Sequence, residues 1–79
     1  MTIQEKFGHV IRTLRKEKNI SQEKLALNAD IDRTYISDIE KGERNVSIET
    51  AKKLADCLQI SLQNLFKEIE NYGDIDWLH

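Results

Sequence analysis

Apolar residues recur with the period of amphipathic helices in separate stretches along the chain. In the first stretch they fall at i, i+4, i+7, i+8 and i+11, on one helical face: Ile3, Phe7, Val10, Ile11 and Leu14. This helix is expected to end near Asn19, because the stripe stops there and asparagine suits a left-handed C-terminal position. Arg15, Lys16 and Lys18 in its last turn interact favourably with the helix dipole.

Side chains that cap helix N-termini predict four further helices. Each stands directly before an apolar period: Ser21, Asp32, Ser47 and Ser61. The helix after Asp32 is expected to run from Arg33 to Lys41 and to end at Gly42. Residues 70–79 have no helical period. We therefore expect an all-α fold, a compact five-helix domain over residues 1–69, followed by an acidic C-terminal tail over residues 70–79.

The composition agrees with a single helical domain. The 79 residues leave no room for a second folded unit. The chain has no proline and three glycines, which are too few turn-forming residues for a β-sandwich. One cysteine, Cys57, excludes an intrachain disulfide and a multi-cysteine zinc site. We expect neither a metal nor another cofactor.

Charge is divided unevenly along the chain. Residues 1–54 carry a net charge of +2 and residues 55–79 one of −4, within a total of −2. The basic portion permits a nucleic-acid partner without proving one. The first stretch is too charged for a signal-peptide core, and no apolar run approaches the ~20 residues that span a bilayer. We expect a cytoplasmic protein with no membrane partner.

Two of the predicted helices have the spacing of a helix-turn-helix. The stretch from Gln22 to Lys41 contains both helices and a turn of about three residues between them. Ala26 is small where the second helix must approach the first closely, and Ile36 and Ile39 anchor the second helix.

This pattern resembles the helix-turn-helix family of phage-repressor and xenobiotic-response-element type, over roughly residues 6–69. The resemblance is carried by ISQEKLALNADIDRTYISDIEKGERNVSIETAKKLADCLQISLQNLF. Members of that family usually have glycine where this chain has Asp30, and aspartate tolerates positive φ better than most residues. The resemblance implies a sequence-specific DNA-binding transcription regulator whose partner is double-stranded operator DNA.

The outward face of the second motif helix is the candidate base-reading surface. With Ile36 and Ile39 inward, helical geometry points one set of residues away from the core and places two more on the flanks. The set comprises Thr34, Ser37, Asp38 and Lys41, flanked by Arg33 and Tyr35. The second helix of such a motif lies in the major groove, where the Arg33 guanidinium matches O6 and N7 of guanine.

The other polar residues of this face have two interpretations each. Thr34 and Ser37 either contact bases or are ordinary exposed positions. Tyr35 either packs against the core edge or reaches the DNA. Asp38 either accepts a hydrogen bond from a cytosine amino group or keeps wrong sequences away.

Phosphate contacts are expected from helix N-termini and from the loop after the recognition helix. The resemblance implies a set of residues at or near the DNA backbone: Gln22, Lys41, Arg44, Asn45 and Ser47. It also suggests an ion pair between Arg15 and Glu40 that ties the first helix to the recognition helix.

The fifth predicted helix carries an apolar stripe at i, i+3, i+4 and i+7, formed by Leu62, Leu65, Phe66 and Ile69. Part of this stripe must close the core, and we expect the remainder to form a two-fold interface, although a wholly internal stripe is the alternative. In the tail, Ile75, Trp77 and Leu78 either pack against the dimer edge, are disordered, or bind a partner protein.

The residue inventory argues against an enzyme. His9 and His79 stand at opposite ends of the chain, and no glycine-rich phosphate loop or nucleophile–base pair is found. We expect no catalytic residue. No small-molecule effector is expected, because there is no second domain to bind one.

These features together predict a homodimeric transcription regulator on palindromic operators. The DRTYIS segment and the GERNVSI loop look most like those of autoregulating controller proteins of restriction–modification systems. A stand-alone phage-type repressor is the nearest alternative. An antitoxin-like module that binds a protein through its C-terminal segment is another, and the neighbouring genes would separate these functions.

Overall fold

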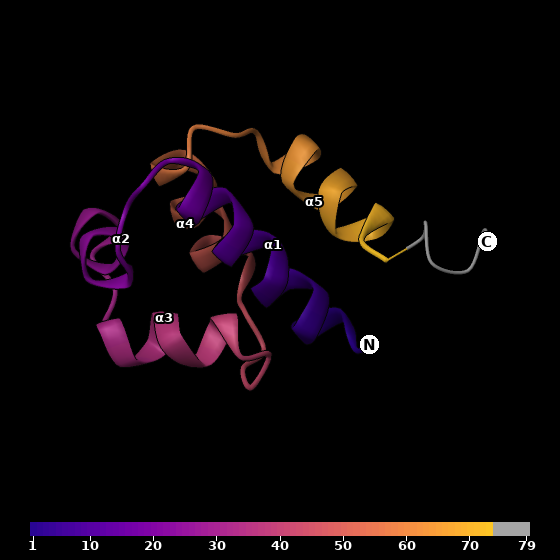
Figure 1. Ribbon diagram of the computed structural model, residues 1–79, viewed down its shortest axis with the longest axis horizontal. Helices are drawn as coiled ribbons and strands as arrows, with labels where there is room; N and C mark the ends of the chain where they lie inside the picture. The colour runs from indigo at the N-terminus through magenta and orange to yellow at the C-terminus, as the bar shows by residue number, and fades with distance from the viewer. Residues whose placement is uncertain (74–79) are drawn as a thin grey trace.

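A computed structural model of the chain describes residues 1–73, and within them all regular structure is helical, as expected (Figure 1). The helices are α1 (Ile3–Glu17), α2 (Gln22–Ala29), α3 (Arg33–Glu40), α4 (Ile48–Cys57) and α5 (Leu62–Asn71). The all-α architecture with a helix-turn-helix formed by α2 and α3 is confirmed.

Each helix begins at a side chain that accepts a hydrogen bond from an amide of the first turn. The four predicted caps, Ser21, Asp32, Ser47 and Ser61, are confirmed. A fifth cap, Thr2, starts α1 by a reciprocal pair: Thr2 Oγ1 accepts from the Glu5 amide at 3.1 Å, and Glu5 Oε1 accepts from the Thr2 amide at 2.8 Å. The hydrogen bond from the Thr2 amide to the Glu5 carboxylate is the main cause that lowers the pKa of Glu5.

Left-handed residues end three of the helices. Asn19, Asp30 and Gln59 have φ of 57°, 56° and 58°. Asp30 adopts the conformation usually taken by glycine at the turn of the motif, so the prediction that aspartate can hold this turn is confirmed. Recognition helix α3 ends at Glu40, one residue earlier than predicted, with Lys41 as its cap.

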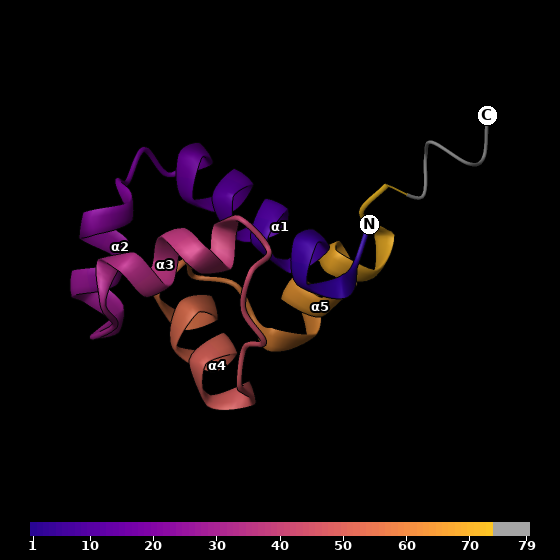
Figure 2. The same ribbon diagram turned by 90° about the horizontal axis from the view of Figure 1, so that it is seen from below.

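Helix α1 packs against α3 and α5, whereas α2 packs against α3 and α4 (Figure 2). Each helix contributes a fully buried aliphatic side chain to one continuous core: Ile11, Leu25, Ile36, Leu54 and Leu65 all have 0% exposure. Burial of the apolar stripes from all the helices supplies the main driving force for folding. It also fixes the direction in which α3 presents its polar face.

Helix α1 lies in close contact with the end of α3 at Gly8. A Cβ atom at this position would collide with the Ile39 carbonyl oxygen and would lie 2.8 Å from the Glu40 carbonyl oxygen. Only glycine therefore allows the backbones of α1 and α3 to meet at this distance.

The C-terminal boundary differs from the one predicted. Helix α5 continues through Glu70 to Asn71, and Tyr72 is half-buried against the core. The Tyr72 ring stacks on His9 with centroids 5.4 Å apart and an angle of 12° between the planes. The helix extends beyond residue 69 because Tyr72 packs against His9 and the core. The apolar periodicity of the sequence does not reveal this contact. The tail residues Ile75, Trp77 and Leu78, and His79, lie outside the described residues.

Candidate nucleic-acid interface

The polar face of α3 forms one wall of a shallow surface hollow. The hollow is lined by residues that were all predicted to contact DNA: Gln22, Arg33, Thr34, Ser37, Asp38 and Lys41. Arg33, Thr34 and Lys41 are exposed, and Ser37 and Asp38 are half-buried. The structure thus brings the start of α2 beside the outward face of α3.

Tyr35 does not line this hollow. Its half-buried ring packs against the core, which matches the first of its two interpretations. The Arg44 guanidinium lies over the ring, 5.1 Å from its centroid. A cation held over an aromatic face in this way is attracted by the negative charge of the ring face.

Arg44 also contacts the candidate base-reading surface. Its Nε lies 3.4 Å from Oδ2 of Asp38 in an ion pair. The two residues are six positions apart, so they would not share a face of a continuous helix. Gly42, with φ of 77°, reverses the chain and brings them together. No periodicity in the sequence predicts this contact.

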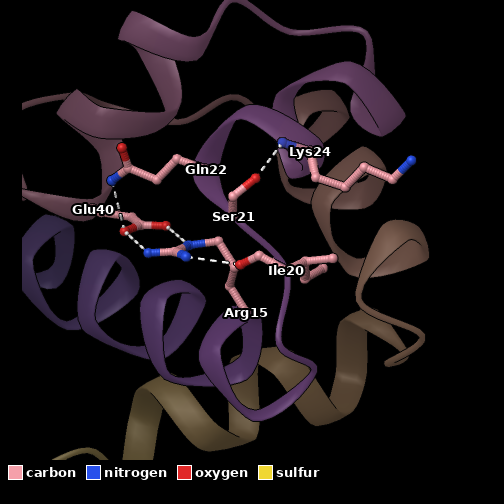
Figure 3. A network of polar contacts seen from close by, with 6 residues as sticks. All are labelled: Arg15, Ile20, Ser21, Gln22, Lys24 and Glu40. Atoms are coloured by element: carbon pink, nitrogen blue, oxygen red, sulfur yellow. Dashed lines mark hydrogen bonds and ion pairs between the residues drawn. The ribbon is translucent and has the colours of Figure 1, made fainter.

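A buried polar network joins α1, α2 and α3 (Figure 3). Arg15 binds Glu40 through two hydrogen bonds, Nε to Oε2 at 2.7 Å and Nη2 to Oε1 at 3.1 Å. This is the ion pair that the resemblance suggested. Arg15 Nη1 also donates to the carbonyl oxygen of Ile20 at 2.8 Å. The fork-to-fork geometry holds the end of α3 at a set angle to α1.

The network includes Gln22, which was predicted only as a phosphate contact. Its Nε2 donates to Oε1 of Glu40 at 3.1 Å, so Glu40 binds Arg15 and Gln22 at once. Gln22 therefore lies in the hollow with its side-chain amide held by the same carboxylate that orients α3 (Figure 3). The residue was identified from the sequence, but its partner was not.

The loop between α3 and α4 holds the remaining predicted phosphate contacts. Asn45 Oδ1 accepts from Gln4 Nε2 at 2.6 Å, and this contact ties the loop to the start of α1. Ser47 Oγ accepts from the Thr50 amide at 3.0 Å and so caps α4. Gln4 was not predicted to take part, because it lies 41 residues from Asn45.

The sequence profile of the helix-turn-helix family matches residues 11–65, which include the whole of this interface except its contacts with the start of α1. The chain belongs to the helix-turn-helix family.

Within this helix-turn-helix family, the chain is similar to controller proteins of restriction–modification systems. It is 48% identical over 66 residues to control protein C.MunI from Mycoplasma sp, covering 82% of this chain and 89% of that protein. The crystal structure of the controller protein C.AhdI from Aeromonas hydrophila superposes with a TM-score of 0.77 and 44% identity, over 80% of this chain and 96% of that one. A structure of the controller protein C.Esp1396I, a tetramer bound to its natural 35-base-pair operator, has a TM-score of 0.76 and 37% identity, over 87% and 96% of the two chains.

The apolar stripe of α5 in this helix-turn-helix protein is divided between the core and the surface. Leu65 and Ile69 are buried within the chain, with exposures of 0% and 2%, so their assignment to a dimer interface is corrected. They point inwards because α5 packs on both α1 and α4, and these two positions face that contact. Phe66 is 45% exposed and Leu62 is half-buried, so the exposed part of the stripe is centred on Phe66.

Three further features concern metal binding, thiol reactivity and membrane insertion in the part of the chain that the structure describes. No group of three or more His, Cys, Asp or Glu side chains there is placed to hold a metal ion. Burial, with a smaller contribution from Asp56, raises the pKa of the Cys57 thiol and disfavours its reactive thiolate form. None of the helices between residues 1 and 73 is both long and apolar enough to cross a membrane.

Proposed function

We propose that the protein is a sequence-specific DNA-binding transcription regulator that acts as a homodimer on palindromic operators, as the autoregulating controller of a restriction–modification system. The observation that carries this proposal is the hollow beside α3, where polar and charged side chains from two helices converge on the outward face of the second motif helix, the helix that enters the major groove in motifs of this kind. The similarity to C.MunI and C.AhdI supports the controller subclass. On this proposal the protein is not an enzyme and acts in the cytoplasm, where its operator lies.

In this function Arg33 is the principal base-reading residue. It is exposed at the first turn of α3, and a recognition helix presents its N-terminal residues to the base edges. Thr34, Ser37 and Asp38 follow along the same wall of the hollow and would read neighbouring bases. Tyr35, packed against the core, would contact the DNA at the edge of this surface.

Contacts to the DNA backbone would come from both sides of the hollow. Gln22, at the first position of α2, and Lys41, at the end of α3, lie at its border. Arg44, Asn45 and Ser47 would form a second contact region in the loop that leads to the N-terminus of α4. Such contacts set the register of the protein on the duplex without reading sequence.

Arg33→Ala is expected to weaken binding to the specific site by about 1–3 kcal/mol and to relax base preference, with little change on scrambled DNA. Fluorescence anisotropy titrations of both duplexes at one salt concentration measure the two affinities. Arg12→Ala removes the same charge from an exposed position of α1 outside the hollow and is the control. Unchanged discrimination in Arg33→Ala would remove Arg33 from its proposed role.

We propose that the homodimer forms around Phe66. Its ring borders an apolar groove at the start of α1 and α4, together with Ile3, Phe7, Val46 and Ile48. Ile3 and Ile48 are exposed by 58% and 77%, so this patch offers aliphatic and aromatic surface that a second copy would cover. Arg44 and Asn45 also line this groove, so in a dimer formed here the DNA-contact loop of each copy would lie at the interface.

Phe66→Asp is expected to weaken dimerisation by at least ~10-fold, because it removes an aromatic anchor and places a charge in an apolar contact. The partly exposed side chain makes this change compatible with folding, which circular dichroism checks. Sedimentation velocity over a dilution series measures the dimer. Gln63→Asp adds the same charge at an exposed position of α5 and is the control. A folded Phe66→Asp variant with the wild-type sedimentation profile would contradict this interface.

The proposed function is tested by titrating the protein on the DNA immediately upstream of its own gene and on scrambled DNA at the same salt. Salt-dependent binding of at least two chains per site, with a specific-to-scrambled ratio of ~10³ or more, is the expected result. Equal affinity for the two DNAs would contradict the autoregulating controller.

A further inference from the structure

Asp38 and Arg44 face each other at the edge of the candidate DNA surface. Asp38 lines the same hollow as Arg33, and its Oδ2 is 3.4 Å from Arg44 Nε. The backbone holds this arrangement in place, because the amide of Glu43 donates to the Asp38 carbonyl oxygen at 3.0 Å and the amide of Gly42 to that of Ile39 at 3.0 Å. The loop that leaves α3 is therefore tied back against its last turn.

The pair is accessible to solvent and can be opened. The Arg44 side chain is 53% exposed and that of Asp38 is 28% exposed. An exposed ion pair at this distance contributes little to stability, so a second anion can compete for the guanidinium. The Arg44 guanidinium also lies over the Tyr35 ring, 5.1 Å from its centroid, and this contact does not require Asp38.

We infer that Asp38 competes with DNA phosphate for Arg44, and that this competition lowers the affinity of the protein for non-specific DNA. This inference rests on the proposed function and assigns Asp38 a role through Arg44 in addition to any base contact. When Arg44 turns to a phosphate, the Asp38 carboxylate loses its cation and faces the negative charge of the duplex. The free protein thus keeps one of its phosphate-binding cations occupied.

At a specific site, a base with an amino group compensates Asp38 for the loss of Arg44 as its partner. Cytosine N4 and adenine N6 donate hydrogen bonds in the major groove, and a carboxylate accepts them. DNA with such a donor opposite Asp38 supplies a new partner when Arg44 leaves, whereas DNA without one leaves the carboxylate unpaired. The ion pair therefore increases the ratio between specific and non-specific affinity by penalising wrong sequences.

A double-mutant cycle on scrambled DNA tests this coupling. Asp38→Asn is expected to tighten binding to scrambled DNA about fivefold in the wild-type background, but less than about twofold in an Arg44→Gln background, since no guanidinium remains to be released. The dependence of log affinity on log salt concentration should steepen by about 1 in Asp38→Asn, as one more phosphate contact forms. Asp56→Asn, at an exposed α4 residue paired with Lys52 at 2.9 Å, makes the same charge change and is the control.

The outcomes separate the inference from the function on which it rests. Equal tightening of Asp38→Asn in the two backgrounds means simple charge repulsion and overturns the coupling. Weaker binding of Asp38→Asn to scrambled DNA overturns it as well. A wild-type protein that fails to discriminate the upstream DNA refutes the proposed controller, while the cycle on scrambled DNA still decides whether Asp38 and Arg44 are coupled.

Discussion

Glu40→Leu should destabilise the protein by about 3–5 kcal/mol, because it leaves the Arg15 guanidinium buried without its carboxylate. Arg15 and Glu40 are only 9% and 8% exposed, and Glu40 accepts hydrogen bonds from both Arg15 and Gln22. A chain of 79 residues has about 4–12 kcal/mol of stability in total, so the loss is a large share of it. Urea unfolding followed by circular dichroism measures the change in free energy of unfolding.

The double variant Arg15→Met with Glu40→Leu separates the charge effect from the loss of packing. Replacing both partners by apolar side chains of similar size removes the unpaired charge, so most of the lost stability should return. Lys52→Ala breaks an exposed pair on α4 and should change stability by less than about 1 kcal/mol. A Glu40→Leu variant within about 1 kcal/mol of the wild type would show that the buried pair does not hold α3 to α1.

Gly8→Ala should destabilise the protein by about 3 kcal/mol. In an exposed helix the same change would instead increase stability, by at most ~1 kcal/mol. The added Cβ would meet backbone atoms of Ile39 and Glu40, and a backbone carbonyl cannot rotate away as a side chain does. Helices α1 and α3 would have to separate, which would also strain the bidentate contact between Arg15 and Glu40. Thermal unfolding measures the effect.

Thr13→Ala is the matched control for the glycine substitution. Thr13 is exposed on α1, so alanine there should leave the stability equal or slightly higher, by up to ~0.6 kcal/mol, through helix propensity alone. A melting temperature of Gly8→Ala at or above that of the wild type would mean that the close approach of α1 and α3 is relaxed without cost.

Glu40→Leu and Gly8→Ala should both affect DNA binding, but to different degrees. Both act on the junction between α1 and the end of α3, so the folded fraction of either variant would present α3 at an altered angle. Gln22 loses its partner in Glu40→Leu but keeps it in Gly8→Ala if the helices adjust. This contrast identifies how far the orientation of α3 depends on the polar network and how far on backbone packing.

The sequence by itself determined the helices and the motif. Apolar period and capping side chains are local properties, so the starts at Ser21, Asp32, Ser47 and Ser61 could be predicted without any knowledge of packing. The outward face of α3 followed from the inward positions of Ile36 and Ile39, since helical geometry relates the two. The turn at Asp30 likewise depends on one residue's tolerance of positive φ.

Only the tertiary structure decided which side chains from different elements contact each other. The contacts of Gln4 with Asn45, Gln22 with Glu40 and Asp38 with Arg44 join residues from different elements, and their distances depend on how the helices pack. The same reason explains why α5 runs past residue 69 and why Leu65 and Ile69 face the core. The need for glycine at position 8 has no local cause either, because it arises where two backbones meet. Periodicity reports which way a side chain points along its own helix, whereas its partner is set by the packing of the whole chain.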